Sequence, residues 1–150
     1  MKLTHTIARV LQSKRQNRIL SISPDQTVYE AIRKMADYGV GALLVMSDNQ
    51  LCGLISERDY ARKVVLKGLM SKDILVREIM TTAIVSVNPR RPVDECMAIM
   101  TEHRFRHLPV MENGVVVGVV SQGDLVKWII SEQEEVIHEL ESYIVSSYPA

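Results

Sequence analysis

The chain has 150 residues, and its 18 Lys and Arg balance its 18 Asp and Glu, so the formal net charge is zero. No long-range field then favours nucleic acid or an anionic membrane, and no apolar run approaches the ~20 residues of a membrane helix. Cys52 and Cys96 belong to no Cys-x-x-Cys or Cys/His pattern, so we expect no metal site. Without a signal-like apolar N-terminus, we expect a cytoplasmic protein.

The N-terminal region contains one amphipathic stretch. Ile7, Val10 and Leu11 fall on one face of a helix predicted over Thr4–Gln12. We expect this short helix to cover a module edge.

The next segment opens with a strand and a capped helix. Ile19–Ile22 is a short β run that Ser23-Pro24 ends. Thr27 then caps a helix with Glu30 at the capping-box distance, and Gly39 suits the left-handed residue that terminates a helix.

Two hairpins and a linker helix are also predicted. Turns at Asp48-Asn49 and Asn113-Gly114 each join two apolar strands. A short helix is predicted over Lys72–Ile79, and Pro92 suits the first position of the helix after it. The hairpin strands are predicted over residues 42–46, 51–55, 108–111 and 115–120.

These elements form a repeat. Residues 19–65 align without gaps with residues 84–130, an offset of 65, and 12 of the 47 pairs are identical. Each copy predicts the order β-α-β-β-α. One copy is too small to bury its sheet and both helices, so we expect an α/β (α+β) fold of two packed repeats related by a pseudo-two-fold axis.

The predicted organisation has five parts. They are a lead-in helix over residues 1–18, a first repeat over 19–68, a linker over 69–83, a second repeat over 84–130 and a C-terminal helical extension over 131–150.

The last predicted helix carries a narrow apolar stripe that continues from the second repeat into the extension. Its apolar or uncharged positions follow a 4-3-4-3-4 spacing, which gives an a/d seam of under three heptads. Two interpretations stay open: the seam packs on its own module, or it contacts a second copy of the chain. The positions are Val126, Ile130, Gln133, Ile137, Leu140 and Ile144.

The repeat resembles a known family, the CBS domain, and two in tandem resemble a CBS pair, or Bateman module. The likeness covers about residues 19–130. It implies a regulatory sensor that binds adenosine-containing ligands such as AMP, ADP, ATP, NAD or S-adenosylmethionine, and that forms a homodimer. The segments that carry it are Ser23-Pro24, Asn88-Pro89, 53–59, 77–81, 107–110 and 118–124.

A Ser-x-x-Asp motif occurs in each copy, at Ser56/Asp59 and Ser121/Asp124. By residue chemistry alone, capping of a helix N-terminus is the better interpretation. The resemblance implies that these side chains bind ribose hydroxyls instead, and the two roles are compatible. A helix N-terminus also favours a nearby phosphate.

The resemblance further implies two sites that each straddle both copies. Arg106 and His107 would meet a phosphate in the first site, while the aligned Gly41-Ala42 offers no side-chain donor to the second. Arg58 would reach toward the second site, and Arg62 lies one turn on. Site one would use Ser56, Asp59, Ile84, Val85, Arg106, His107 and Pro109; site two would use Ser121, Asp124, Ile19, Leu20, Ala42 and Leu43.

Each of these residues also has a purely structural interpretation. The basic residues suit a solvated face equally well, and His107 suits a structural histidine. The sequence contains no Gly-x-Gly-x-x-Gly, Walker loop, His-Glu-x-x-His or Gly-x-Ser-x-Gly pattern, which argues against an enzyme. We therefore expect a nucleotide sensor that acts on an unknown protein partner or on its own oligomer. The alternative is a structural dimerisation module with vestigial ligand sites.

Overall fold

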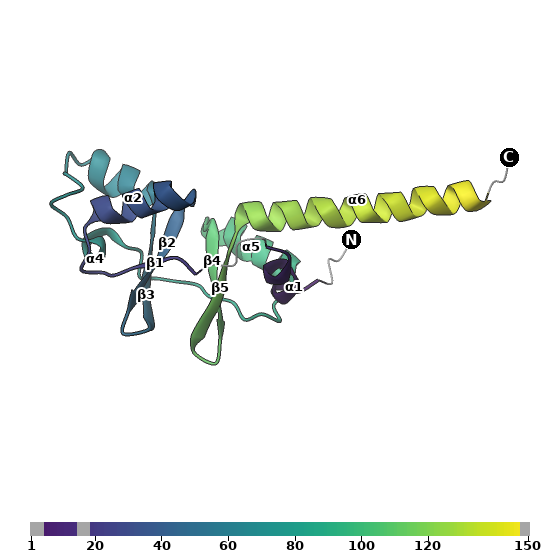
Figure 1. The fold of residues 1–150 in the computed structure, drawn as a ribbon, viewed down its shortest axis with the longest axis horizontal. Helices are drawn as coiled ribbons and strands as arrows, with labels where there is room; N and C mark the ends of the chain where they lie inside the picture. The colour runs from purple at the N-terminus through teal and green to yellow at the C-terminus, as the bar shows by residue number, and fades with distance from the viewer. Residues whose placement is uncertain (1–4, 15–18, 148–150) are drawn as a thin grey trace.

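A computed structural model describes residues 5–14 and 19–147, and it confirms the predicted mixed α and β class. The two repeats lie next to each other, and a long C-terminal helix projects beyond the second (Figure 1). The elements are α1 (Ile7–Ser13), β1 (Ser21–Ile22), α2 (Val28–Tyr38), β2 (Ala42–Ser47), β3 (Gln50–Ser56), α3 (Glu57–Tyr60), the π-helix η1 (Ala61–Val65), α4 (Val76–Ile79), α5 (Val93–His103), β4 (His107–Glu112), β5 (Val115–Ser121) and α6 (Gln122–Ser147).

The local signals in the first repeat are confirmed. Thr27 and Glu30 form the predicted capping box at the start of α2, and Gly39 ends that helix with φ of 66°. The residue pairs at both hairpin turns have positive φ, which suits the tight turns that match the strand twist. These pairs are Asp48-Asn49 and Asn113-Gly114.

The helix boundaries differ in three places. The linker helix α4 spans Val76–Ile79 and not Lys72–Ile79, because Leu75 is extended and pairs with Thr27. Helix α5 begins at Val93, one residue after the proline. The segment after Ser56 is one α-helical turn followed by a π-helix rather than a continuous α-helix.

The two sheets are unequal. In the first repeat β1 runs parallel to β2, and β2 pairs antiparallel with β3. The second sheet contains β4 and β5, and the strand expected at residues 84–87 is reduced to a parallel bridge between Val87 and Val110. In the first repeat Leu44 N donates to Leu20 O at 3.2 Å. The equivalent of Leu44 is Pro109, which has no N–H to donate.

The segments that precede the repeats pack crosswise. Helix α1 precedes the first repeat but contributes Ile7, Val10 and Leu11 to the core of the second. Helix α4 precedes the second repeat but contributes Val76 and Ile79 to the core of the first. The helix predicted at the N-terminus therefore does cover a module edge, that of the second repeat; Thr4 lies outside the described residues.

Equivalent backbone bonds hold both segments. Val93 N donates to His5 O and Val28 N donates to Ile74 O, each at 2.9 Å. The offset from Val28 to Val93 is 65, whereas the offset from His5 to Ile74 is 69. Each half of the chain therefore has an equivalent segment before its repeat. These two segments align at an offset four residues larger than the offset of the repeats. Among the described residues, no helix is both long and apolar enough to cross a membrane.

Gly53 and its repeat equivalent Gly118 make room for these crossing segments. A Cβ on Gly53 would lie 2.9 Å from Thr81 O and 2.9 Å from Met80 Sδ, so the linker backbone would have to shift. A Cβ on Gly118 would lie 2.8 Å from Leu11 Cδ2, the end of a flexible side chain.

We expect Gly53→Ala to destabilise the protein by about 1–3 kcal/mol, because overpacking against backbone is hard to relieve. Gly118→Ala should cost less, because Leu11 can rotate. Gly123→Ala is the control, since its Cβ would meet Ser121 Oγ at an ordinary 3.7 Å. Urea unfolding monitored by circular dichroism measures all three. Equal stability of Gly53→Ala and wild type would contradict the tight approach.

Candidate functional site

Two cavities lie between the repeats. The first has a volume of about 480 Å³ and is lined by all seven residues expected for site one. Its other lining residues include Arg58, Arg104 and Thr81, the last from the linker. The expected residues are Ser56 and Asp59 from the first repeat with Ile84, Val85, Arg106, His107 and Pro109 from the second.

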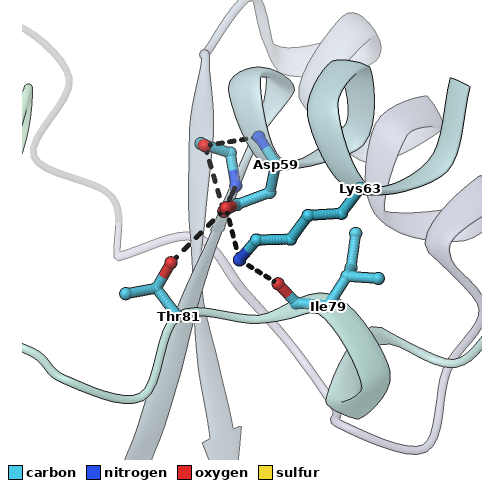
Figure 2. A network of polar contacts seen from close by, with 5 residues as sticks. Asp59, Lys63, Ile79 and Thr81 are labelled. Carbon is cyan, nitrogen blue, oxygen red and sulfur yellow. Dashed lines mark hydrogen bonds and ion pairs between the residues drawn. The ribbon is translucent and has the colours of Figure 1, made fainter. Parts of the chain in front are cut away.

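Asp59 is the buried charge of the first cavity, with 9% of its surface exposed. Its Oδ2 accepts hydrogen bonds from Ser56 N at 3.0 Å and Ser56 Oγ at 3.1 Å. Its Oδ1 pairs with Lys63 Nζ at 3.0 Å and accepts from Thr81 Oγ1 at 3.4 Å (Figure 2). Lys63 also donates to Ile79 O at 2.8 Å. Both carboxylate oxygens are therefore engaged, and the network ties α3 and η1 to the linker.

The second cavity is larger, about 1290 Å³. Five of the six residues expected for site two line it, and Ile19, which is 41% exposed, does not. The five are Leu20, Ala42 and Leu43 from the first repeat and Ser121 and Asp124 from the second.

Asp124 lies in the first turn of α6 and repeats the capping contacts between Ser56 and Asp59, with a different counter-ion. Its Oδ2 accepts from Ser121 N at 2.8 Å and pairs with Lys14 Nζ at 2.9 Å. Ser121 Oγ accepts from Asp124 N at 3.0 Å. Burial by itself raises the pKa of Asp124, but the Ser121 and Lys14 interactions outweigh burial and lower that pKa below its usual range.

His107 lies between the cavities and lines both. Burial lowers its pKa, and the nearby Asp124 carboxylate does not reverse that effect. His107 is therefore neutral at pH 7, so it offers a hydrogen bond and not the positive charge that a phosphate contact would use. The cations at the first cavity are the arginines: Arg58, Arg104 and Arg106.

Two basic residues depart from the expected places. Arg58, which directly precedes Asp59 on the short helix α3, lines the first cavity rather than the second. Arg62, one turn further on, lines neither cavity.

Several lining residues were not predicted. Lys127 is the repeat equivalent of Arg62, so the alignment could have found it. Lys14 and Thr81 come from segments outside the main alignment; Thr81 ends the segment 77–81 that carries part of the family resemblance, whereas no motif marks Lys14. Trp128 lines the second cavity at the position that Lys63 has in the first repeat. Among the described residues, no three His, Cys, Asp or Glu side chains cluster as metal ligands would.

Comparison with known proteins identifies the repeat. The family model for the CBS domain matches residues 15–66 and 76–131, more than half of the chain. A putative signal-transduction protein with CBS domains from Burkholderia ambifaria is 47% identical, with a TM-score of 0.84 over 86% of this chain and 96% of that one.

Two further relatives extend the comparison. The mitochondrial CBS domain-containing protein CBSX3 of Arabidopsis thaliana is 37% identical, over 95% of this chain and 73% of its own length. That name refers to another compartment, so the cytoplasmic location expected from this sequence stays a prediction. The CBS domain pair of protein MJ0100, solved with 5′-methylthioadenosine and S-adenosylmethionine, is 19% identical, with a TM-score of 0.76 over 86% of this chain and 98% of that one.

The doubled fold, the cavities between its halves and these relatives together show that the chain belongs to the CBS-domain family, as a tandem pair, which is a regulatory module.

Proposed function

We propose that the chain is a sensor that binds adenine nucleotides of the AMP, ADP, ATP or NAD type, AMP foremost, in the two cavities without converting them. The observation that carries this proposal is the placement of a Ser/Asp pair from one repeat opposite apolar strands of the other, twice. A carboxylate accepts hydrogen bonds from a ribose diol, and apolar walls suit the faces of a base.

The size and charge of the cavities support this class of ligand. The first cavity, at about 480 Å³, falls within the roughly 300–1,000 Å³ of small-molecule sites. Three arginines line it, and guanidinium groups suit phosphate oxygens. The two ligands of the MJ0100 pair share an adenosine group and differ in what is attached to it. Adenosine is therefore the part of the ligand that we expect this chain to recognise, and the arginines favour a phosphate in the first cavity.

Thermal unfolding with AMP, ADP, ATP, NAD and S-adenosylmethionine tests the proposal. Ligand at 100 times its Kd stabilises a protein by about 2.7 kcal/mol, which for this size raises the midpoint by roughly 5–10 °C. We expect AMP to do so for wild type and for Asp73→Asn, an exposed carboxylate outside both cavities. The Asp59→Asn, Asp124→Asn double variant should lose the shift.

The outcomes separate three classes of protein. A shift with intact nucleotide recovered by chromatography supports the sensor, whereas steady loss of the nucleotide would indicate an enzyme. If no nucleotide shifts the midpoint, the chain is a structural dimerisation module with vestigial sites. An undiminished shift in the double variant would refute the assignment of Asp59 and Asp124.

We also propose that a second copy of the chain covers the apolar stripe of α6. Beyond the second repeat the helix is exposed, with Ile137 at 54%, Leu140 at 56% and Ile144 at 56% (Figure 1). Apolar side chains exposed to water on a projecting helix are unfavourable in a monomer. An a/d spacing suits packing against the same stripe of a second α6 helix. Signal output then runs through this contact or through a partner protein.

We expect Ile137→Asp to convert a dimer to a monomer in sedimentation velocity, because the new carboxylate would lie in the seam. His138→Asp adds the same charge at the next, also exposed, position and should leave the dimer intact. A wild-type monomer at all concentrations, or an unchanged Ile137→Asp dimer, would contradict this interface.

A further inference from the structure

The aspartate of each Ser-x-x-Asp motif is paired with a lysine, but the two lysines have different origins. Lys63 lies four residues after Asp59 on the same helical segment. The position equivalent to Lys63 in the second repeat is Trp128, which cannot neutralise Asp124. Lys14, which directly follows α1, makes that ion pair instead. The N-terminal segment therefore completes a site that the second repeat cannot complete by itself.

Lys14 is held where it is by packing and by a second bond. Its Nζ also donates to Val119 O at 2.8 Å, and its side chain lines the second cavity. Helix α1 just before it is anchored by Val10 and Leu11 in the core of the second repeat. The side chain has 24% of its surface exposed, so the ion pair is only partly screened by water.

The ion pair leaves one oxygen of Asp124 open. Ser121 N and Lys14 Nζ both contact Oδ2, and no described residue donates a hydrogen bond to Oδ1. Asp59 differs, because its Oδ1 is already engaged by Lys63 and Thr81 (Figure 2). An ionised carboxylate accepts at both oxygens, so Asp124 keeps acceptor sites for incoming hydroxyl groups.

We propose that Lys14 is a positioning residue of the second cavity, which orients Asp124 so that its open oxygen accepts from the 2′ and 3′ hydroxyls of a nucleoside. This inference rests on the proposed function, which already assigns ribose hydroxyls to Asp124, and adds Lys14 as the residue that orients this carboxylate. It also makes the N-terminal segment part of a ligand site. The lowered pKa of Asp124 agrees, since Lys14 helps keep the acceptor ionised.

The chain provides a probe for this cavity alone. Trp128 is the single tryptophan of the sequence, and it lines the second cavity but not the first. Titration of the full chain with AMP and with 2′-deoxy-AMP, followed by tryptophan emission, therefore measures second-cavity affinity and its dependence on the diol.

We expect wild type to bind AMP about tenfold more tightly than 2′-deoxy-AMP, as a hydrogen bond to a charged group implies. Lys14→Met should lower the affinity for AMP about tenfold. It should also bring the affinities for AMP and 2′-deoxy-AMP within about twofold of each other. Lys14→Arg keeps the charge and should restore most of the preference. Arg9→Met removes a cation from α1 outside both cavities and should behave as wild type.

Failure of this inference differs from failure of the proposed function. If AMP does not change the emission of Trp128 and no nucleotide of the panel raises the unfolding midpoint of wild type, the proposed function fails. If AMP stabilises wild type but never reaches Trp128, the second cavity does not bind and Lys14 has no such role. Equal diol preference in Lys14→Met and wild type, or loss of that preference in Lys14→Arg, would overturn the inference with the proposed function intact.

Discussion

The structure depends on the crosswise docking of α1 and α4. Each segment forms the same backbone bonds to the repeat other than the one that directly follows it, as Val93 N to His5 O and Val28 N to Ile74 O show. Each also contributes apolar side chains to that repeat's core. The core of the second repeat therefore includes a helix that lies before the first repeat in the chain, so residues 84–147 alone would lack part of that core.

The same docking makes the two cavities unlike each other. Their inner wall is shared, since Gly41, Leu54 and His107 line both. The outer parts differ, because α4 leads into Thr81 beside Asp59, whereas α1 leads into Lys14 beside Asp124. A repeat that preserves Ser and Asp at both sites therefore still produces two different electrostatic environments.

The sequence predicted features that depend on near neighbours. The capping box of Thr27, the turn at Asn113-Gly114 and the doubled order of elements each follow from local spacing. Features that depend on distant segments were missed. The offset of 69 that relates α1 to α4 breaks a gapless alignment at 65, so neither the repeat on which α1 docks nor the ion pair of Lys14 could be anticipated. The lost strand before Val87 depended on the N–H that Pro109 lacks.

The Ser-x-x-Asp motif had two interpretations, helix capping and ligand binding, and the geometry makes them compatible. Capping uses Oδ2 of each aspartate, through Ser56 N and Ser121 N. The contacts of the other oxygen, Oδ1, then determine whether a ligand hydroxyl can bind each aspartate without displacing a residue. At Asp124 a hydroxyl can be added without removing a partner, whereas at Asp59 it must replace Thr81, a residue of the linker, or Lys63, which donates to the linker at Ile79 O. Under the proposed function, the first cavity therefore couples ligand to the linker, while the second binds against an N-terminal segment already in place.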